Sequence, residues 1–169
     1  MTQSILMIQA PLFYEVQDER NLWMTVFLIV INLLLLFLIT KKDQARNKVY
    51  LIGTGFGLLV TLAATILFLT LKQYTEIKTD GVYVKLYPLQ ISYRYYPWKD
   101  IEKSYVRVYN PIREYGGWGL RGRKHNRAIN QSGNDGLQLL FKDGTKLLIG
   151  TQKPQEIEAS LTKLNCYVR

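Results

Sequence analysis

Two uncharged, apolar stretches, residues 21–40 and 49–71, constrain this chain more than any other feature. A helix rises about 1.5 Å per residue, so either stretch is long enough to cross a hydrocarbon core of about 30 Å. The eight residues between them, KKDQARNK, are too polar to enter lipid. We therefore predict an N-terminal tail (1–20), a transmembrane helical hairpin (21–71) and one small domain (72–169).

The balance of charges indicates the kind of partner. The chain has a net charge of +9, and residues 72–169 hold 17 Lys and Arg against 9 Asp and Glu. A basic surface attracts anionic partners, and anionic membrane lipid is the nearest of these for a chain anchored in a bilayer. Membrane lipid is therefore the expected partner, with a membrane protein or a second copy of the chain as further partners.

Few residues suited to catalysis or metal binding are present. His125 is the only histidine and Cys166 the only cysteine, so the chain offers no zinc-ligand cluster and no internal disulfide. Neither a Ser-His-Asp nor a Cys-His arrangement can be argued from these positions. We expect a protein that is not an enzyme and that holds no cofactor and no metal.

The cations that flank the two stretches give conflicting indications of orientation. Short loops rich in Lys and Arg favour the cytoplasmic side of a membrane. The loop between the stretches holds Lys41, Lys42, Arg46 and Lys48, whereas the tail offers only Arg20. The strongly basic domain, in contrast, suits the anionic inner leaflet. We expect a two-span protein of the cell membrane whose domain is cytoplasmic.

Three small or polar residues stand out inside the apolar stretches. Gly53 and Gly57 form a small-xxx-small pair, which lets helices approach closely, so we expect either the first stretch or a second copy of the chain to pack there. Asn32 is predicted to form a hydrogen bond between the two helices. Neither stretch contains Asp, Glu, Lys or Arg, which argues against an ion pathway.

Residues 72–169 show the pattern of a mainly-β domain. Asp80-Gly81 and Asp143-Gly144 each separate two β-prone runs, which is a strong signal for a hairpin. The expected strands are residues 74–79, 82–87, 90–96, 101–109, 127–130, 136–142 and 146–150. The helical apolar period that follows Pro154 predicts a C-terminal helix. Six or seven antiparallel strands and one helix indicate a strongly bent sheet or split barrel that the helix closes.

Several motifs resemble those of known bacterial domains. Asp80-Gly-Val-Tyr-Val84, Trp98-Lys-Asp-Ile101 and the closing helix resemble the bacterial pleckstrin-homology-like domains, which often follow a pair of membrane helices. Pro111-Ile-Arg-Glu-Tyr-Gly-Gly-Trp-Gly119 and the segment from Gly136 to Gln152 are similar to a family of uncharacterised small bacterial membrane proteins. The resemblance implies a pleckstrin-homology-like fold and a two-helix membrane topology, and it implies no activity.

The basic, glycine-rich segment 113–127 is the expected site of function. Its cations suit bidentate contact with phosphate, and its glycines can bring backbone N–H groups close to an anion. Trp118 is expected to enter the membrane interface. The alternative is a long solvated loop whose glycines only serve turns and a bulge. The cations assigned to anion and lipid-headgroup contact are Arg113, Arg121, Arg123, Lys124 and Arg127.

These features support one functional hypothesis and two alternatives. We expect a binding or scaffolding module that contacts anionic headgroups or a protein partner at the bilayer surface. The first alternative is a structural or accessory subunit of a larger membrane complex that assembles through the hairpin, and the second is an extracytoplasmic accessory domain of an enzyme. The interleaved tyrosines and cations also suit single-stranded nucleic acid, but half-buried sheet faces are the commoner use of tyrosine, so no nucleic-acid partner is expected.

Overall fold

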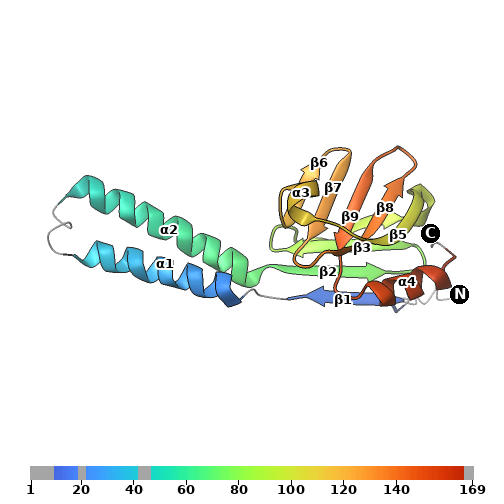
Figure 1. Ribbon diagram of the computed structural model, residues 1–169, viewed down its shortest axis with the longest axis horizontal. Helices are drawn as coiled ribbons and strands as arrows, with labels where there is room; N and C mark the ends of the chain where they lie inside the picture. Colours follow the sequence, from blue (N-terminus) through green and yellow to red (C-terminus); the bar gives the residue numbers. More distant parts are fainter. Residues whose placement is uncertain (1–9, 19–21, 42–46, 166–169) are drawn as a thin grey trace, which may run out of the picture. The chain divides into compact units, whose positions relative to one another are not determined.

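The computed structural model describes residues 10–18, 22–41 and 47–165. It contains two compact units (Figure 1). One unit holds the two long helices, and the other holds the strands that precede and follow them in the sequence. Four residues for which the sequence suggested a role lie outside the described residues: Arg20, Lys42, Arg46 and Cys166.

The helical unit consists of α1, Leu22–Thr40, and α2, Lys48–Thr70. Asn47 caps α2, because its side chain accepts hydrogen bonds from two backbone N–H groups of the first turn at 3.0 and 3.3 Å. Both helices are long and apolar enough to cross a membrane. Within the chain α1 buries no residue and α2 buries only Thr65. A core helix of a water-soluble protein would bury its apolar face, so these helices need another apolar surrounding.

Asn32 joins the two helices through two hydrogen bonds. Its Nδ2 donates to the Thr65 hydroxyl at 2.9 Å, and its Oδ1 accepts from the Thr61 hydroxyl at 2.8 Å. The predicted hydrogen bond between the helices is therefore confirmed.

The two glycines of α2 do not lie against α1. A Cβ atom built on Gly53 or Gly57 would meet no atom within 4 Å. The expectation that the first helix docks there is wrong, because the threonines that bond Asn32, and not these glycines, are turned toward α1. Packing of a second copy of the chain at Gly53 and Gly57 stays a prediction.

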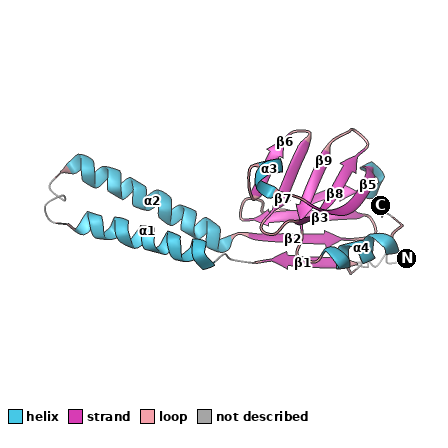
Figure 2. Ribbon diagram, viewed as in Figure 1, coloured by secondary structure: helices cyan, strands magenta, loops and turns pink. Residues whose placement is uncertain are grey.

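The β domain contains two sheets and two short helices (Figure 2). The first sheet has the order β1-β2-β3-β4, with the strands Phe13–Gln17, Lys72–Ile77, Gly81–Tyr87 and Arg94–Pro97. The second has the order β5-β8-β9-β7-β6, with the strands Ile101–Val108, Asp135–Phe141, Lys146–Gly150, Asn126–Asn130 and Gly119–Arg123. A 3-10 turn, Trp98–Asp100, leads from the first sheet to the second. The helices are α3, Pro111–Tyr115, and α4, Pro154–Lys163.

The core lies between the inner faces of the two sheets. Alternate residues of the strands point into it, as expected for strands with one face covered. The Tyr96 ring of β4 lies 5.6 Å from the Phe141 ring of β8, so the two faces meet at this corner. The buried apolar side chains include Phe13, Ile77, Val82, Val84 and Leu86 from the first sheet and Ile129, Leu137, Leu139, Phe141, Leu147 and Ile149 from the second.

The C-terminal helix closes one side of the space between the sheets. α4 contacts β1 of the first sheet and β5 and β8 of the second, and its Ile157 and Leu161 side chains are fully buried. The predicted C-terminal helix is confirmed. Since β1 and β5 are edge strands, β4 and β6 form the opposite edges of the two sheets.

Strand β1 is the main departure from the predicted domain boundaries. We expected residues 1–20 to be a tail, but Phe13–Gln17 pairs with β2 in an antiparallel register that places Gln17 opposite Gln73. Both side-chain amides donate to the carbonyl oxygen of Gly150, at 2.8 and 2.7 Å. Polar residues therefore point into the domain from β1, and this concealed the strand from a hydropathy pattern.

Further polar contacts attach β1 to the rest of the domain. The buried Glu15 carboxylate accepts hydrogen bonds from the Thr151 hydroxyl and the Gln152 N–H, each at 2.7 Å. Directly after β1, Asp18 forms an ion pair of 2.8 Å with Lys72 at the start of β2. The domain therefore extends beyond the predicted 72–169, and the helical hairpin is an insertion between two paired strands.

The strand pattern differs from the prediction in two further ways. The described residues form nine strands instead of six or seven. β7 pairs with β9 in parallel, because β8 intervenes between them in the chain. The third predicted strand, 90–96, begins only at Arg94. Gln90 instead closes a turn, since its N–H donates to the Leu86 carbonyl at 2.7 Å.

The contribution of β1 to stability can be tested by replacing residues 19–71 with a short Gly-Ser linker. Because Gln17 and Gln73 are paired, a few residues can join β1 to β2, and we expect this protein to unfold cooperatively in urea. A fragment that starts at Lys72 should be less stable by about 2 kcal/mol or more, since burial of Phe13 alone contributes about that much. Addition of a peptide of residues 10–18 should restore part of the loss. Equal urea midpoints for the two proteins would contradict the role of β1.

Candidate functional site

The basic segment 113–127 is folded as a helix and a hairpin. Asn110 caps α3, because its Oδ1 accepts the N–H of Arg113 at 3.0 Å, and Pro111 occupies the first helical position. Gly116 ends the helix with φ = +76°. The strands β6 and β7 then form an antiparallel hairpin at the edge of the second sheet. The segment is therefore a short helix followed by an exposed hairpin rather than a continuous loop, and its contact with anions stays a prediction.

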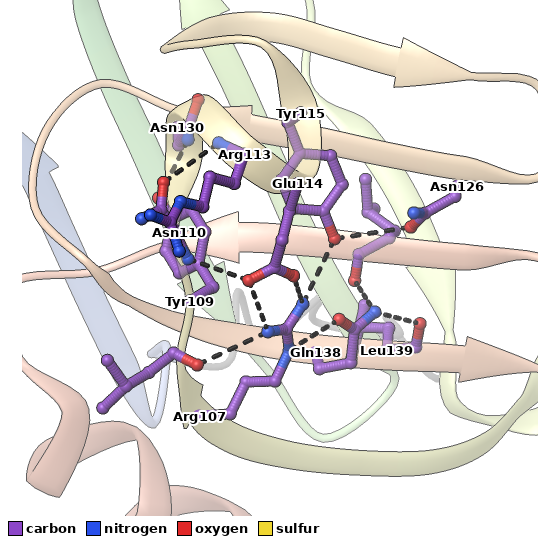
Figure 3. Close-up of polar contacts among 12 residues, drawn as sticks. Arg107, Tyr109, Asn110, Arg113, Glu114, Tyr115, Asn126, Asn130, Gln138 and Leu139 are labelled. Carbon is purple, nitrogen blue, oxygen red and sulfur yellow. Dashed lines mark hydrogen bonds and ion pairs between the residues drawn. The ribbon is translucent and has the colours of Figure 1, made fainter.

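An ion pair holds α3 on the outer face of the second sheet (Figure 3). The Arg107 guanidinium of β5 donates to both carboxylate oxygens of Glu114, with Nη2–Oε2 at 2.7 Å and Nη1–Oε1 at 3.3 Å. Its Nε donates to the Gln138 side chain at 3.1 Å, and the Glu114 carboxylate also accepts the N–H of Asn110 at 2.8 Å. The bidentate geometry fixes the direction of both side chains.

The ion pair changes the titration of its surroundings. The hydrogen bond from Arg107 lowers the pKa of the Glu114 carboxyl below its ordinary value. Burial raises the pKa of the neighbouring Tyr115 hydroxyl. At neutral pH Glu114 is therefore ionised and Tyr115 is a neutral donor, whose hydroxyl lies 3.3 Å from the Asn126 Oδ1 that accepts from it.

Beneath α3 a small apolar cluster secures the hairpin. It contains Tyr109, Tyr115, Ala128 and Leu148, and the two tyrosine rings meet edge to face with centroids 6.1 Å apart. Asn130 of β7 completes the contact, since its Nδ2 donates to the Tyr109 hydroxyl at 2.8 Å and its Oδ1 accepts the Gly119 N–H at 2.9 Å. The site is thus carried by a rigid part of the sheet.

The structure separates the five cations that the sequence grouped. The Arg113, Arg123 and Lys124 side chains are exposed on α3 and at the turn of the hairpin. The Arg121 side chain is also exposed, but its Nε donates to the Trp118 carbonyl at 2.7 Å. Arg127 differs from all of these, because it is half-buried and faces the space between the sheets. Four of the five are therefore exposed, and within the described residues three of these four form no hydrogen bond from the side chain to the backbone.

The glycines of the segment are explained by backbone geometry. Gly122 has φ = +90°, and a Cβ atom there would approach the Asn126 carbonyl oxygen to 2.1 Å, so no other residue fits.

Trp118 is 43% exposed and remains available for contact with an interface. The sequence analysis did not single out Arg107 and Asn130, which organise the site. The sequence around a residue in a strand does not reveal which distant residue its side chain contacts.

The chemistry of the segment favours binding of anions. Its exposed groups are guanidinium and ammonium donors, and His125 lies exposed at the turn between β6 and β7. Across residues 10–18, 22–41 and 47–165, no group of three or more His, Cys, Asp and Glu side chains could hold a metal ion.

The architecture defines a class: a two-sheet, mainly-β domain with an apolar helical hairpin inserted between its first two strands. Within that class, the chain belongs to the family of unknown function DUF6141, whose model matches residues 9–164. The expectation of an uncharacterised family is thereby confirmed. Comparisons with curated proteins and with solved structures found no match.

The Arg107–Glu114 pair predicts a pH dependence of stability. The pKa of Glu114 is lower in the folded than in the unfolded chain, so its contribution is complete above about pH 5 and is lost as the pH falls through the folded value. Glu114→Gln should lower the free energy of unfolding at pH 7 by about 1 kcal/mol or less, because the pair is partly exposed. Urea titrations from pH 7 to about pH 3 should show this difference shrink. A difference that stays constant over that range would show that the carboxylate charge is not involved.

Proposed function

We propose that this protein is a membrane-anchored, non-catalytic binding module whose β domain contacts anionic lipid headgroups at the cytoplasmic face of the cell membrane. The observation that carries the proposal is the exposure of α1 and α2. Their large apolar side chains are exposed along both helices, including Trp23 at 84% and Val49 at 80%. Apolar surface of this extent is unstable in water and suits the hydrocarbon core of a bilayer.

The pairing of β1 with β2 supports the proposed topology. β1 ends just before α1, and β2 begins directly after α2. Because the two strands are hydrogen-bonded to each other, both ends of the hairpin lie on one side of any membrane that the helices cross. The proposal places that side in the cytoplasm, where anionic lipid attracts the excess of cations in residues 72–169.

The fold is also compatible with the pleckstrin-homology-like domain that the motifs resemble. Two sheets around one core and a C-terminal helix over one opening support this assignment. The parallel β7–β9 pair departs from the antiparallel strand order that the resemblance implied. We propose the β domain as a variant of that fold, of bacterial origin.

Orientation can be measured by cysteine labelling of intact cells. In a Cys166→Ser background, single cysteines are introduced by Lys41→Cys next to the loop between the helices and by Ser132→Cys in the β domain. An impermeant maleimide should label the first and not the second, because the β domain is cytoplasmic under this proposal. Lysed cells provide the control, since both positions should then react. Labelling at residue 132 alone in intact cells would invert the orientation.

Headgroup contact is proposed for the exposed cations of α3 and the hairpin turn. A cation near an anionic surface contributes about 1 kcal/mol, so Arg113, Arg123 and Lys124 together contribute up to about 3 kcal/mol. That free energy corresponds to a change of about a hundredfold in the ratio of contacting to detached domains. Trp118 adds an amphipathic ring to the same segment.

The test uses the full chain in nanodiscs, with a fluorophore attached through His125→Cys in the Cys166→Ser background. A quencher on the lipid headgroup should reduce the fluorescence more in anionic than in neutral nanodiscs, and high salt should remove the difference. The variant Arg113→Gln/Arg123→Gln/Lys124→Gln should behave in anionic nanodiscs as the parent does in neutral ones.

A matched control separates a local contact from net charge. Lys99→Gln/Lys103→Gln/Lys163→Gln removes the same charge elsewhere in the β domain and should retain the quenching. Equal quenching by the parent and the first triple variant would refute headgroup contact by these cations. A stoichiometric membrane protein that co-purifies with both would then favour the alternative of an accessory subunit assembled through the hairpin.

A further inference from the structure

A cavity of about 230 Å³ opens between the two sheets on the side where β4 and β6 form the edges. Its lining includes Gln90, Arg94 and Tyr96 from the first sheet and its preceding turn, and Arg121, Gly122 and Arg127 from the β6–β7 hairpin. Three of these residues are arginines, and none of the residues that line the cavity is acidic.

Gln90, in the wall of this cavity, has an unused donor. The residue is only 9% exposed, and its Oε1 accepts the backbone N–H of Leu86 at 3.1 Å, which sets the orientation of the amide. Its Nε2 is consequently directed away from that bond and has no hydrogen-bond partner among the described residues. A buried amide donor without an acceptor is unusual in a folded protein.

Arg127 supplies a second unused donor on the opposite wall. Its Nε is buried and has no partner in the part of the chain that the structure describes. Arg127 is paired across the hairpin with Gly122, so the β6 residue directly opposite it has no side chain. The glycine cannot be exchanged for a larger residue, since a Cβ atom would approach the Asn126 carbonyl oxygen to 2.1 Å.

Arg94 brings a further positive charge to the same mouth. It is paired across the first sheet with Val84, whose side chain is fully buried, so Arg94 also lies on the inner face. The neighbouring cavity does hold acids, Asp100 and Asp143, and shares Tyr96 and Arg127 with the first. Asp143, however, already accepts from the N–H and the hydroxyl of Thr145 at 2.8 and 2.7 Å.

We propose that the cavity bounded by Gln90, Arg94 and Arg127 binds a phosphoryl group. The two unpartnered polar atoms of the residues that line it are donors, and guanidinium groups match the oxygens of a phosphoryl group in geometry and charge. A cation would be repelled, and an apolar ligand would leave the donors unpaired. The volume of about 230 Å³ accommodates a phosphoryl group together with part of the molecule that bears it.

This site does not depend on the proposed headgroup contact. The surface cations Arg113, Arg123 and Lys124 do not line the cavity, whereas Gln90 and Arg94 belong to no part of the basic segment. A phosphoryl group can come from a lipid headgroup or from a soluble phosphorylated compound. Both sources offer the same oxygens, and the measurement described next distinguishes them.

The test is calorimetric titration of the full chain with inorganic phosphate in an uncharged maltoside detergent. We expect saturable binding with a dissociation constant of about 1 mM or lower, because two or three charge-assisted hydrogen bonds are enough for that affinity. Arg127→Gln, Arg94→Gln and Gln90→Glu should each weaken binding by about tenfold or more. Gln90→Glu keeps an acceptor for the Leu86 N–H and replaces the unpartnered donor in the cavity wall by an oxygen that repels phosphate.

Arg123→Gln is the matched control, since it removes the same charge from the same hairpin outside this cavity. Its affinity for phosphate should stay within about twofold of the parent. Thermal unfolding without phosphate identifies any variant that fails to fold, and the remaining two then decide. No saturable binding by the parent up to about 10 mM phosphate, or equal losses in Arg123→Gln and Arg127→Gln, would overturn the proposal.

Mixed micelles separate the two sources of the phosphoryl group. Phosphatidic acid and diacylglycerol share their apolar chains and differ in the phosphate. If the site takes a lipid headgroup, phosphatidic acid should lower the apparent affinity for inorganic phosphate and diacylglycerol should not. If neither lipid competes, the site takes a soluble phosphorylated compound. The triple variant at residues 113, 123 and 124 should bind phosphate as the parent does, so failure of this site and failure of headgroup contact remain distinguishable.

Discussion

The hydrogen bonds from Gln17 and Gln73 to the Gly150 carbonyl are the constraint on which the rest of the structure depends. They join the strand before the helical hairpin to the strand after it, and they attach both to the second sheet. The β domain therefore cannot be completed until both apolar helices have been synthesised and placed, because β1 has no partner before β2 exists. Such non-local pairing is slow compared with local folding, so insertion of the helices precedes completion of the domain under the proposed membrane topology.

The sequence predicted those elements whose cause is local. The two apolar helices, the hairpins at Asp80-Gly81 and Asp143-Gly144, and the helix after Pro154 all carry their signals within a few residues. β1 was missed because Glu15 and Gln17 point into the domain and form hydrogen bonds with residues more than a hundred positions away. α3 had a signal that was overlooked: an Asn cap, a proline at the first position and a glycine after the last turn.

The candidate site shows a different limit of sequence analysis. Five cations in fifteen residues indicated a basic surface, but a count of charges does not tell which face of a hairpin each side chain occupies. Arg123 and Arg127 are four residues apart across a turn, and the first is exposed while the second faces the space between the sheets. Gln90 and Arg94 reach that space from the other sheet. Gln90, Arg94 and Arg127 come together only in the folded chain, because they lie near the edges of two different sheets that pack against each other.

The unpartnered polar atoms of the domain indicate why its two openings differ. At the side that α4 covers, Gln17 and Gln73 donate their amide N–H groups to Gly150, and only their acceptor oxygens have no partner within the described chain. A buried oxygen without a partner is tolerated better than a buried N–H without one. At the open side, Gln90 uses its acceptor, and its donor and that of Arg127 stay unpartnered within the described chain. Each buried donor of this kind costs about 1–3 kcal/mol while it stays unpaired. These two unpartnered donors, beside a mouth that no helix of the described chain covers, are the reason for proposing an anionic ligand at this side of the domain.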